Sequence, residues 1–304
     1  MSWKIIFSLI FFLIVVALLI FYWFIPLEEI SFEFSQPKNT NFTLNASLSE
    51  NMQFYENMRY SGSDISYRIQ DCPLKKSDDM KTAFEIIESQ TLLNFYPVIA
   101  NEEISVTCES KARVEGVLFV AGEGGPINIT WSENFNVIHK GSVLLIRESK
   151  CENPNIGIHE LLHALGFDHS TNPDNIMYEV SKCNQEIGQD TINLLNWLYS
   201  FPSQPDLSFE NASASMKGRY LDVSVTIKNN GLKESENTKI IIYADNKPLK
   251  EIELSSLEIG HGRIITLTNI FVLQRDIDEL EFFINSDFEE LNKDNNRITL
   301  EIKK

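Results

Sequence analysis

The sequence predicts a single transmembrane helix, then a domain of mixed α and β structure, then an all-β sandwich. A charge-free apolar segment lies near the N-terminus, helical and strand-like periods alternate over residues 62–200, and only strand-like runs follow from residue 207. The chain has 304 residues, with 26 Lys and Arg against 43 Asp and Glu and a formal charge of −17. This balance argues against nucleic-acid binding, which requires a basic surface.

The apolar segment is IIFSLIFFLIVVALLIFYWFI, residues 5–25. At about 1.5 Å per residue, its helix spans roughly 31 Å, the thickness of the hydrocarbon layer. Lys4 precedes it and two glutamates at 28 and 29 follow, which predicts a cytoplasmic N-terminus. A cleaved signal peptide is the alternative, but its apolar region is shorter and small residues follow it. We predict an uncleaved signal anchor at residues 1–26, in a single-pass protein of the cell membrane with residues 27–304 outside the cytoplasm.

The exterior chain starts with a segment of low periodicity. Residues 27–61 are rich in Ser, Asn, Gln and Glu and predict a stalk. Alternation at 65–69 predicts a strand, Ser77 precedes an amphipathic helical stretch that it can cap, and 104–108 predicts a second strand. This β-α-β order predicts a partly parallel sheet.

More strands and two helices complete the predicted domain at residues 62–200. One helix is expected to start at Asn153, as the capping residue, and Pro154, and the last covers about 189–200. The prolines of FPSQPD at 201–206 predict a linker. The remaining expected strands are 114–121, 127–131 and 142–146, with the glycine-rich sequence GEGGP at 122–126 as a turn.

Four cysteines, Cys72, Cys108, Cys151 and Cys183, lie in the exterior part, where an even number favours two disulfides. Three pairings are possible. Moderate loop lengths favour Cys72 with Cys108 and Cys151 with Cys183, but sequence alone leaves the choice open. A zinc site made of these thiols has no CxxC spacing to support it.

The residues that carry chemistry lie in HELLHALGFDH, residues 159–169. His159 and His163 are four residues apart, so a helix places both imidazoles on one face. Gly166 can end the helix in the left-handed conformation and bring His169 to the same ion. Three nitrogen ligands leave the fourth zinc position open, as in catalytic sites. Glu160 then lies where a carboxylate reaches the attacking water.

HExxHxxGxxH is the signature of the metzincin zinc endopeptidases, and Met177 in NIMY matches their methionine turn. Within this clan the chain most resembles the matrixins, through GFDHS, the short DNIMY turn and the ISYRI strand that leads into a helix. The resemblance covers residues 62–200. It implies an α+β metzincin-like fold, with a mixed, mostly parallel twisted sheet and three helices.

The resemblance also implies roles for particular residues. The three histidines would hold one catalytic Zn²⁺, Glu160 would act as general base, and Met177 would form a hydrophobic floor under the ligands. Tyr178 and the segment up to Cys183 would shape the S1′ pocket for the side chain after the scissile bond. The calcium loops usual in this family are not visible, so structural Ca²⁺ stays possible without support. His139 stands alone and is interpreted as an ordinary residue.

Residues 207–304 contain short alternating strands separated by turns such as KNNG and DNKP, which predict an antiparallel β-sandwich. The region resembles the immunoglobulin-like CARDB domains at VTIKNNG and at ELNKDNNRITLEI. Such domains serve in adhesion, spacing or substrate presentation. His261 and the Asp and Asn residues at 293–296 are interpreted as turn residues, not metal ligands.

The sequence therefore predicts a membrane-anchored extracytoplasmic zinc endopeptidase. Its expected partners are a protein or peptide substrate and the membrane, with no nucleic acid, and the sandwich can contact surface proteins or glycans. The alternative is a surface adhesion protein whose metalloprotease-like domain is inactive. A zinc hydrolase of cell-wall peptides differs from the first hypothesis only in its substrate.

Overall fold

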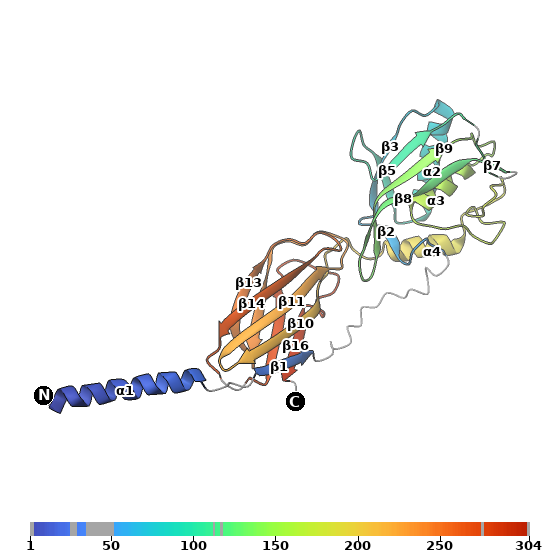
Figure 1. Ribbon diagram of the computed structural model, residues 1–304. Coiled ribbons are helices and arrows are strands. Elements are labelled where there is room, and N and C mark those ends of the chain that lie inside the picture. Colours follow the sequence, from blue (N-terminus) through green and yellow to red (C-terminus); the bar gives the residue numbers. More distant parts are fainter. Residues whose placement is uncertain are drawn as a thin grey trace.

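The computed structural model describes residues 3–24, 29–34, 52–111, 113–115, 118–274 and 277–302 (Figure 1). Helix α1, Trp3–Phe24, has 22 residues and is apolar. It is long and apolar enough to cross a membrane, although a signal sequence near an N-terminus has the same properties. The helix is therefore a signal or an anchor.

The first domain after α1 is built on a six-stranded sheet with the order β2-β9-β5-β3-β4, and β8 pairs with β9. Every pairing in this sheet is parallel except that of β8 with β9. This agrees with the mixed, mostly parallel sheet that the sequence predicts. The strands are β2 Met58–Tyr60, β3 Asp64–Ile69, β4 Asn94–Pro97, β5 Ile104–Cys108, β8 Gly122–Trp131 and β9 Asn136–Leu145.

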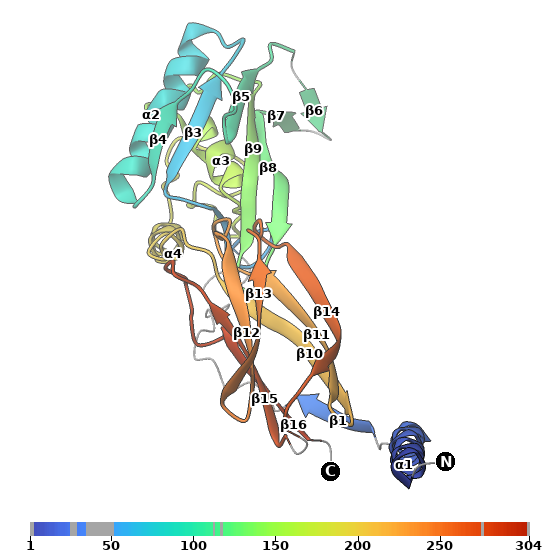
Figure 2. The same ribbon diagram turned by 90° about the vertical axis from the view of Figure 1, so that its left-hand side faces the viewer.

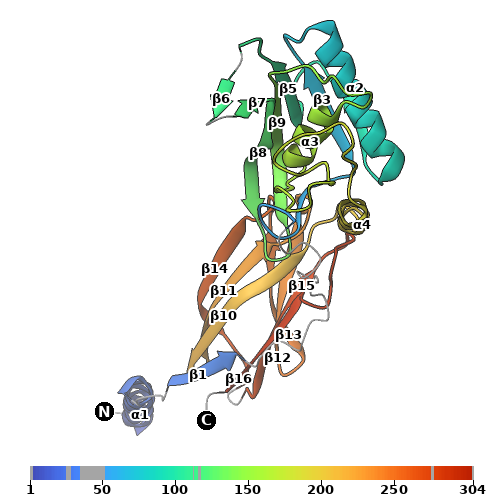
Figure 3. The same cartoon turned by 90° about the vertical axis from the view of Figure 1, so that its right-hand side faces the viewer.

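The same domain contains three helices, α2 Leu74–Gln90, α3 Asn155–Ala164 and α4 Gln189–Leu198. α2 packs against α3, and α3 packs against β8 and β9 (Figure 3). α2 starts earlier than predicted, because the Ser77 amide already donates to the Pro73 carbonyl inside the first turn, at 3.0 Å. α3 starts after Pro154 without the expected side-chain cap from Asn153.

Two strand predictions also differ from the structure. The run at 114–121 is a short hairpin, β6 Arg113–Glu115 with β7 Leu118–Val120, and not one strand. The GEGGP sequence is no turn, because it forms the first half of β8 and pairs with β9. Glycine is needed here because α3 lies too close to this half of β8 for most side chains.

Both disulfides form with the pairing that the loop lengths favoured. Cys72, just before α2, is bonded to Cys108 at the end of β5. Cys151, just before α3, is bonded to Cys183. The second disulfide thus connects the residues that precede the histidine helix to a loop more than 30 residues further along the chain.

The C-terminal domain is an antiparallel sheet of eight strands, in the order β13-β12-β15-β16-β1-β10-β11-β14. The sheet encloses one hydrophobic core, which takes buried side chains from β10 and β11 as well as from β12, β15 and β16. Its strands are β1 Glu29–Phe34, β10 Leu207–Lys217, β11 Tyr220–Asn229, β12 Thr238–Ala244, β13 Lys247–Leu254, β14 Gly262–Phe271, β15 Glu279–Asn285 and β16 Arg297–Ile302.

Strand β1 is the main departure from the predicted organisation, because it lies in the segment expected to be a stalk. It pairs with β10 on one side and β16 on the other. The side chain of Phe32 is 5% exposed and belongs to the core of the C-terminal domain. This domain therefore lies between α1 and the first domain, although most of it follows the first domain in sequence (Figure 1). The rest of the expected stalk up to residue 51 lies outside the described residues.

The two domains meet through a small apolar cluster and polar contacts. Phe135 and Val137 of the first domain and Leu232 of the second are buried together. The amide of Asn230 donates to the carboxylate of Glu133 at 3.3 Å, and the Glu133 amide donates back to the Asn230 side chain at 3.2 Å. These contacts adjoin the expected linker at 201–206.

The position of β1 leads to a test. Phe32→Ala removes a buried aromatic side chain, so we expect it to lower the free energy of unfolding of the C-terminal domain by about 3 kcal/mol. Ile264→Ala is the control, because Ile264 is 71% exposed on β14 and its loss should change stability little. Urea unfolding of the full chain in detergent measures both. Equal stabilities for the two variants would mean that β1 is a dispensable part of the domain.

Candidate active site

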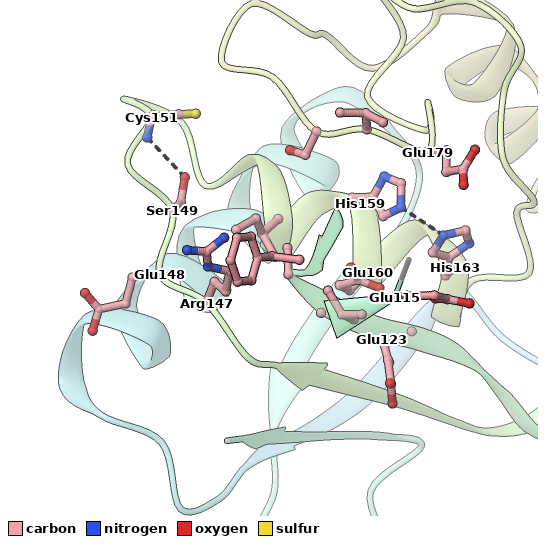
Figure 4. Close-up of a pocket in the computed structure, with 18 of the residues that line it drawn as sticks. Glu115, Glu123, Arg147, Glu148, Ser149, Cys151, His159, Glu160, His163 and Glu179 are labelled. Carbon is pink, nitrogen blue, oxygen red and sulfur yellow. Dashed lines mark hydrogen bonds between the residues drawn. The ribbon is translucent and has the colours of Figure 1, made fainter. Parts of the chain in front are cut away.

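His159 and His163 lie one turn apart on α3 and point into the same pocket (Figure 4). Their side chains are buried, at 8% and 6% exposed. The two Nε2 atoms are 3.0 Å apart. The i, i+4 spacing therefore brings two nitrogen ligands together, as the sequence predicts.

His169 reaches the same point because the chain turns sharply after α3. Gly166 has φ +98°, in the left-handed region, and its amide donates to the His163 carbonyl at 2.9 Å. The His169 Nε2 atom lies 3.2 Å from that of His163. The predicted role of Gly166 is thus the one the structure gives it: it ends the helix and redirects the chain toward the third ligand.

The three imidazoles fit a tetrahedral metal ion. Their potential ligand atoms all lie within 4.8 Å of one another. Nitrogens bound at 2.0–2.1 Å to a tetrahedral zinc ion would be roughly 3.3 Å apart, close to the separations found here. Burial lowers the pKa of His159, and burial together with the neighbouring His159 lowers that of His163 to about 4. Both are therefore neutral near pH 7, the form that binds metal.

Hydrogen bonds to backbone carbonyls set the orientation of two ligands. The Nδ1–H of His159 donates to the Ile176 carbonyl, and that of His163 donates to the Phe167 carbonyl, each at 2.7 Å. Each bond places the proton on Nδ1 and leaves the Nε2 lone pair facing the metal position. The sequence analysis did not find these carbonyls, because a backbone acceptor has no residue-type signal.

The segment predicted to form the methionine turn is hydrogen-bonded to the histidine segments. Met177 is 2% exposed and packs in the core of the first domain. Its carbonyl accepts a hydrogen bond from the amide of Ser170, the residue after His169, at 2.8 Å. Since the preceding carbonyl of Ile176 orients His159, this turn positions the segments of two ligands at once.

Glu160 is a residue of α3. Its side chain lies against β8, and it is 5% exposed. Burial, with a smaller contribution from the charge of Glu123, raises the pKa of its carboxyl group to about 8. A divalent cation on the adjacent histidines would stabilise the charged carboxylate and lower this pKa again. The carboxylate lines the same pocket as the imidazoles, which suits a proton acceptor beside a metal.

Two glycines of β8 make room for Glu160. A Cβ atom at Gly122 would lie 2.7 Å from the Glu160 side chain, and one at Gly124 would lie 2.2 Å from the Glu160 carbonyl oxygen. At Gly125 a Cβ atom would meet nothing within 4 Å. The close contact of β8 with α3 therefore explains why glycine occupies two of these three positions.

The pocket has a volume of about 780 Å³ and is lined by the β7–β8 region, the segment before α3, the histidines and residues 179–181. Tyr178, the expected S1′ residue, is not one of the described residues that line it, whereas the adjacent Glu179, Val180 and Ser181 are. His139 lies away from this pocket, and its Nε2 is 2.8 Å from the Thr130 hydroxyl.

The chain is similar to known proteins in two regions. Residues 59–200 match the family model described as Matrixin, and residues 204–300 match the CARDB model. A solved CARDB domain from Pyrococcus furiosus, in complex with di-metal ions, is 19% identical, with a TM-score of 0.28. The match covers 33% of this chain and 87% of that one. No curated protein matches the chain.

The glycines of β8 provide a test of how the site is built. We expect Gly124→Ala to reduce peptidase activity by at least about tenfold, since a contact of 2.2 Å with backbone must move α3 or β8. Gly125→Ala is the matched control and should retain activity, because that position is open. Cleavage of a fluorogenic peptide, with circular dichroism to check folding, measures the effect. Comparable activity in both alanine variants would show that β8 is free to move away from α3.

Proposed function

We propose that the chain is a membrane-anchored zinc endopeptidase acting outside the cytoplasm. Residues 59–200 match the Matrixin model and contain an intact histidine triad, and residues 204–300 match the CARDB model. The observation that carries this proposal is the convergence of three Nε2 atoms beside a buried glutamate in one open cleft. This set of groups suits hydrolysis of a peptide bond with a water molecule as the nucleophile.

We assign a distinct role to each group. His159, His163 and His169 would hold one zinc ion, which supplies a Lewis acid for the scissile carbonyl. Glu160 accepts the proton of the attacking water and passes it to the leaving amine. Its position is held by the packing of α3 against β8. Met177 touches no reacting atom in this proposal and keeps the ligand segments in place.

This mechanism gives separate expectations for binding and catalysis. Glu160→Ala should lower peptidase activity by about 10²- to 10⁴-fold while one zinc per chain is retained, because the carboxylate moves protons and does not bind the metal. Glu85→Ala, at an exposed position of α2 outside the pocket, is the control and should keep the activity. Hydrolysis of an unstructured protein and elemental analysis of the full chain in detergent measure the two properties.

Two outcomes would contradict the assignment. Unchanged cleavage by the Glu160→Ala variant would remove Glu160 from the mechanism. A zinc-loaded unaltered chain that cleaves neither proteins nor peptides would favour the inactive adhesion protein instead.

The cleft suggests how a substrate lies and which side chains it prefers. Among the described strands, β8 pairs on one side only, with β9, so its other edge can bind an extended peptide. Five glutamates line the pocket, at positions 115, 123, 148, 160 and 179 (Figure 4). Glu123 is paired with Arg113, and a zinc ion would offset the charge of Glu160. The exposed carboxylates of Glu115 and Glu179 therefore favour basic side chains in a substrate.

A peptide library tests this preference. We expect peptides with Lys or Arg near the scissile bond to be cleaved faster than their Glu counterparts, with the difference shrinking at high salt. Glu179→Gln should reduce the preference, since this carboxylate lies on the pocket wall. A library profile that ignores charge would show that the pocket glutamates do not select substrates.

We also propose that α1 is an uncleaved anchor. The length and apolar composition of α1 and the two disulfides support membrane insertion and an oxidising exterior compartment. β1 follows α1 closely in sequence and joins the C-terminal domain, so this domain would stand next to the bilayer and hold the peptidase domain beyond it.

Membrane fractionation tests the anchor. Alkaline carbonate should leave the full chain in the pellet, with an intact N-terminus by mass spectrometry, because a spanning helix resists extraction. A Leu13→Arg, Val16→Arg double variant should become extractable, since each charge at the helix centre costs about 3 kcal/mol. Release of the unaltered chain as a form that begins after residue 25 would indicate a cleaved signal peptide.

A further inference from the structure

We propose that the C-terminal domain binds one calcium ion at its junction with the peptidase domain, through side-chain oxygens of Asp206, Glu290, Asn295 and Asn296. The sequence analysis interpreted the Asn residues as turn residues. The structure confirms the turn, in which the Asn296 amide donates to the Lys293 carbonyl at 3.3 Å. Within this turn the amide oxygens of Asn295 and Asn296 are inaccessible to water and face no hydrogen-bond donor.

The first observation is a concentration of unpartnered oxygens. Asp206 is 1% exposed and Asn296 is 2% exposed. Asp206 Oδ2, Asn295 Oδ1 and Asn296 Oδ1 are buried without a partner, and they are three of seven such side-chain atoms in the described part of the chain. Buried polar atoms are nearly always satisfied, so three unpartnered acceptors in one place call for a ligand that carries positive charge.

The second observation is that these side chains form one connected group. The amide nitrogen of Asn295 donates to Asp206 Oδ1 at 2.9 Å, and that of Asn296 donates to Glu290 Oε1 at 2.8 Å. The amide of Leu207, the residue after Asp206, donates to Glu290 Oε2 at 2.7 Å. Hydrogen bonds therefore join the start of β10 to the β15–β16 loop.

Glu290 accepts hydrogen bonds from the Ser286 hydroxyl, the Asn296 side chain and the Leu207 amide, but no basic side chain of the described residues neutralises the group. Glu290 is 7% exposed, and within the described residues neither it nor Asp206 has a Lys, Arg or His partner within 4.0 Å. Burial and the charges of Glu290 and Glu133 raise the pKa of Asp206 to about 6. A bound cation would offset this repulsion and the cost of burial.

The donor set indicates the kind of cation. All the candidate ligand atoms are carboxylate or amide oxygens, which suit hard divalent cations and not zinc. Calcium accepts six to eight oxygens in irregular geometry, whereas magnesium requires a near-octahedral arrangement. Four side chains from two separate segments, with water to complete the shell, fit calcium better.

The site lies where the interdomain linker enters the C-terminal domain. The Pro205 carbonyl accepts from the Leu291 amide at 2.9 Å, and the Asp206 amide donates to the side chain of Asn229 at 3.1 Å. The β15–β16 loop reaches the end of the domain nearest α4 (Figure 2). A calcium ion here would strengthen the end of the domain that carries the peptidase.

Calcium titration tests the proposal. Thermal unfolding of the full chain in detergent is followed with CaCl₂ up to about 5 mM, a range that covers the weak sites of extracellular modules. Constant zinc and the Glu160→Ala background exclude self-cleavage and active-site effects. We expect calcium to raise the midpoint for the C-terminal domain and magnesium at equal concentration to raise it much less.

Matched variants locate the effect. Asp206→Asn, which keeps the size and removes the charge, should weaken the apparent calcium affinity at least about tenfold. Asn295→Ala should weaken it similarly and serves if the first variant does not fold, because Asn295 is partly exposed. Asp278→Asn, at an exposed position just before β15, is the control and should respond like the parent. Equal calcium responses in Asp206→Asn or Asn295→Ala and the parent, or no calcium response in the parent, would overturn the proposal and leave water as the occupant.

Discussion

The peptidase site depends on the hydrogen bonds that fix the histidine rings. An imidazole binds a metal through one nitrogen only if its proton is held on the other. Here the carbonyls of Ile176 and Phe167 hold those protons, and both come from the chain that follows α3. The turn at Gly166 and the methionine turn therefore place the third ligand and orient the first two.

A second constraint comes from the close packing of α3 against β8. This contact buries Glu160 next to the metal position and leaves no space for a Cβ atom at two glycines of the strand. Burial raises the pKa of Glu160, and a cation on the histidines would lower it again. The same packing therefore places the proton acceptor where the charge of a metal ion can act on it.

The sequence predicted the histidine motif correctly but not two of the strands. The histidine positions, Gly166 and the helix that carries them follow from local periodicity and residue chemistry, and the structure brings them together as predicted. GEGGP was wrongly interpreted as a turn, because a glycine-rich strand and a turn look alike until the neighbouring helix is known. β1 was missed although its six residues alternate polar and apolar side chains, because such a short run between an apolar helix and a polar segment carries little signal.

By itself the sequence determined the zinc-binding motif, the helix that presents it, the apolar N-terminal segment and the two-domain composition. These are local properties, set by residue type and by spacing within a few turns of chain. Only the tertiary structure decided that β1 returns to the C-terminal domain, that the carbonyl of Ile176 orients His159, and that Asp206 meets Asn295. Contacts between segments far apart in sequence depend on packing and backbone hydrogen bonds, which no single stretch of residues encodes.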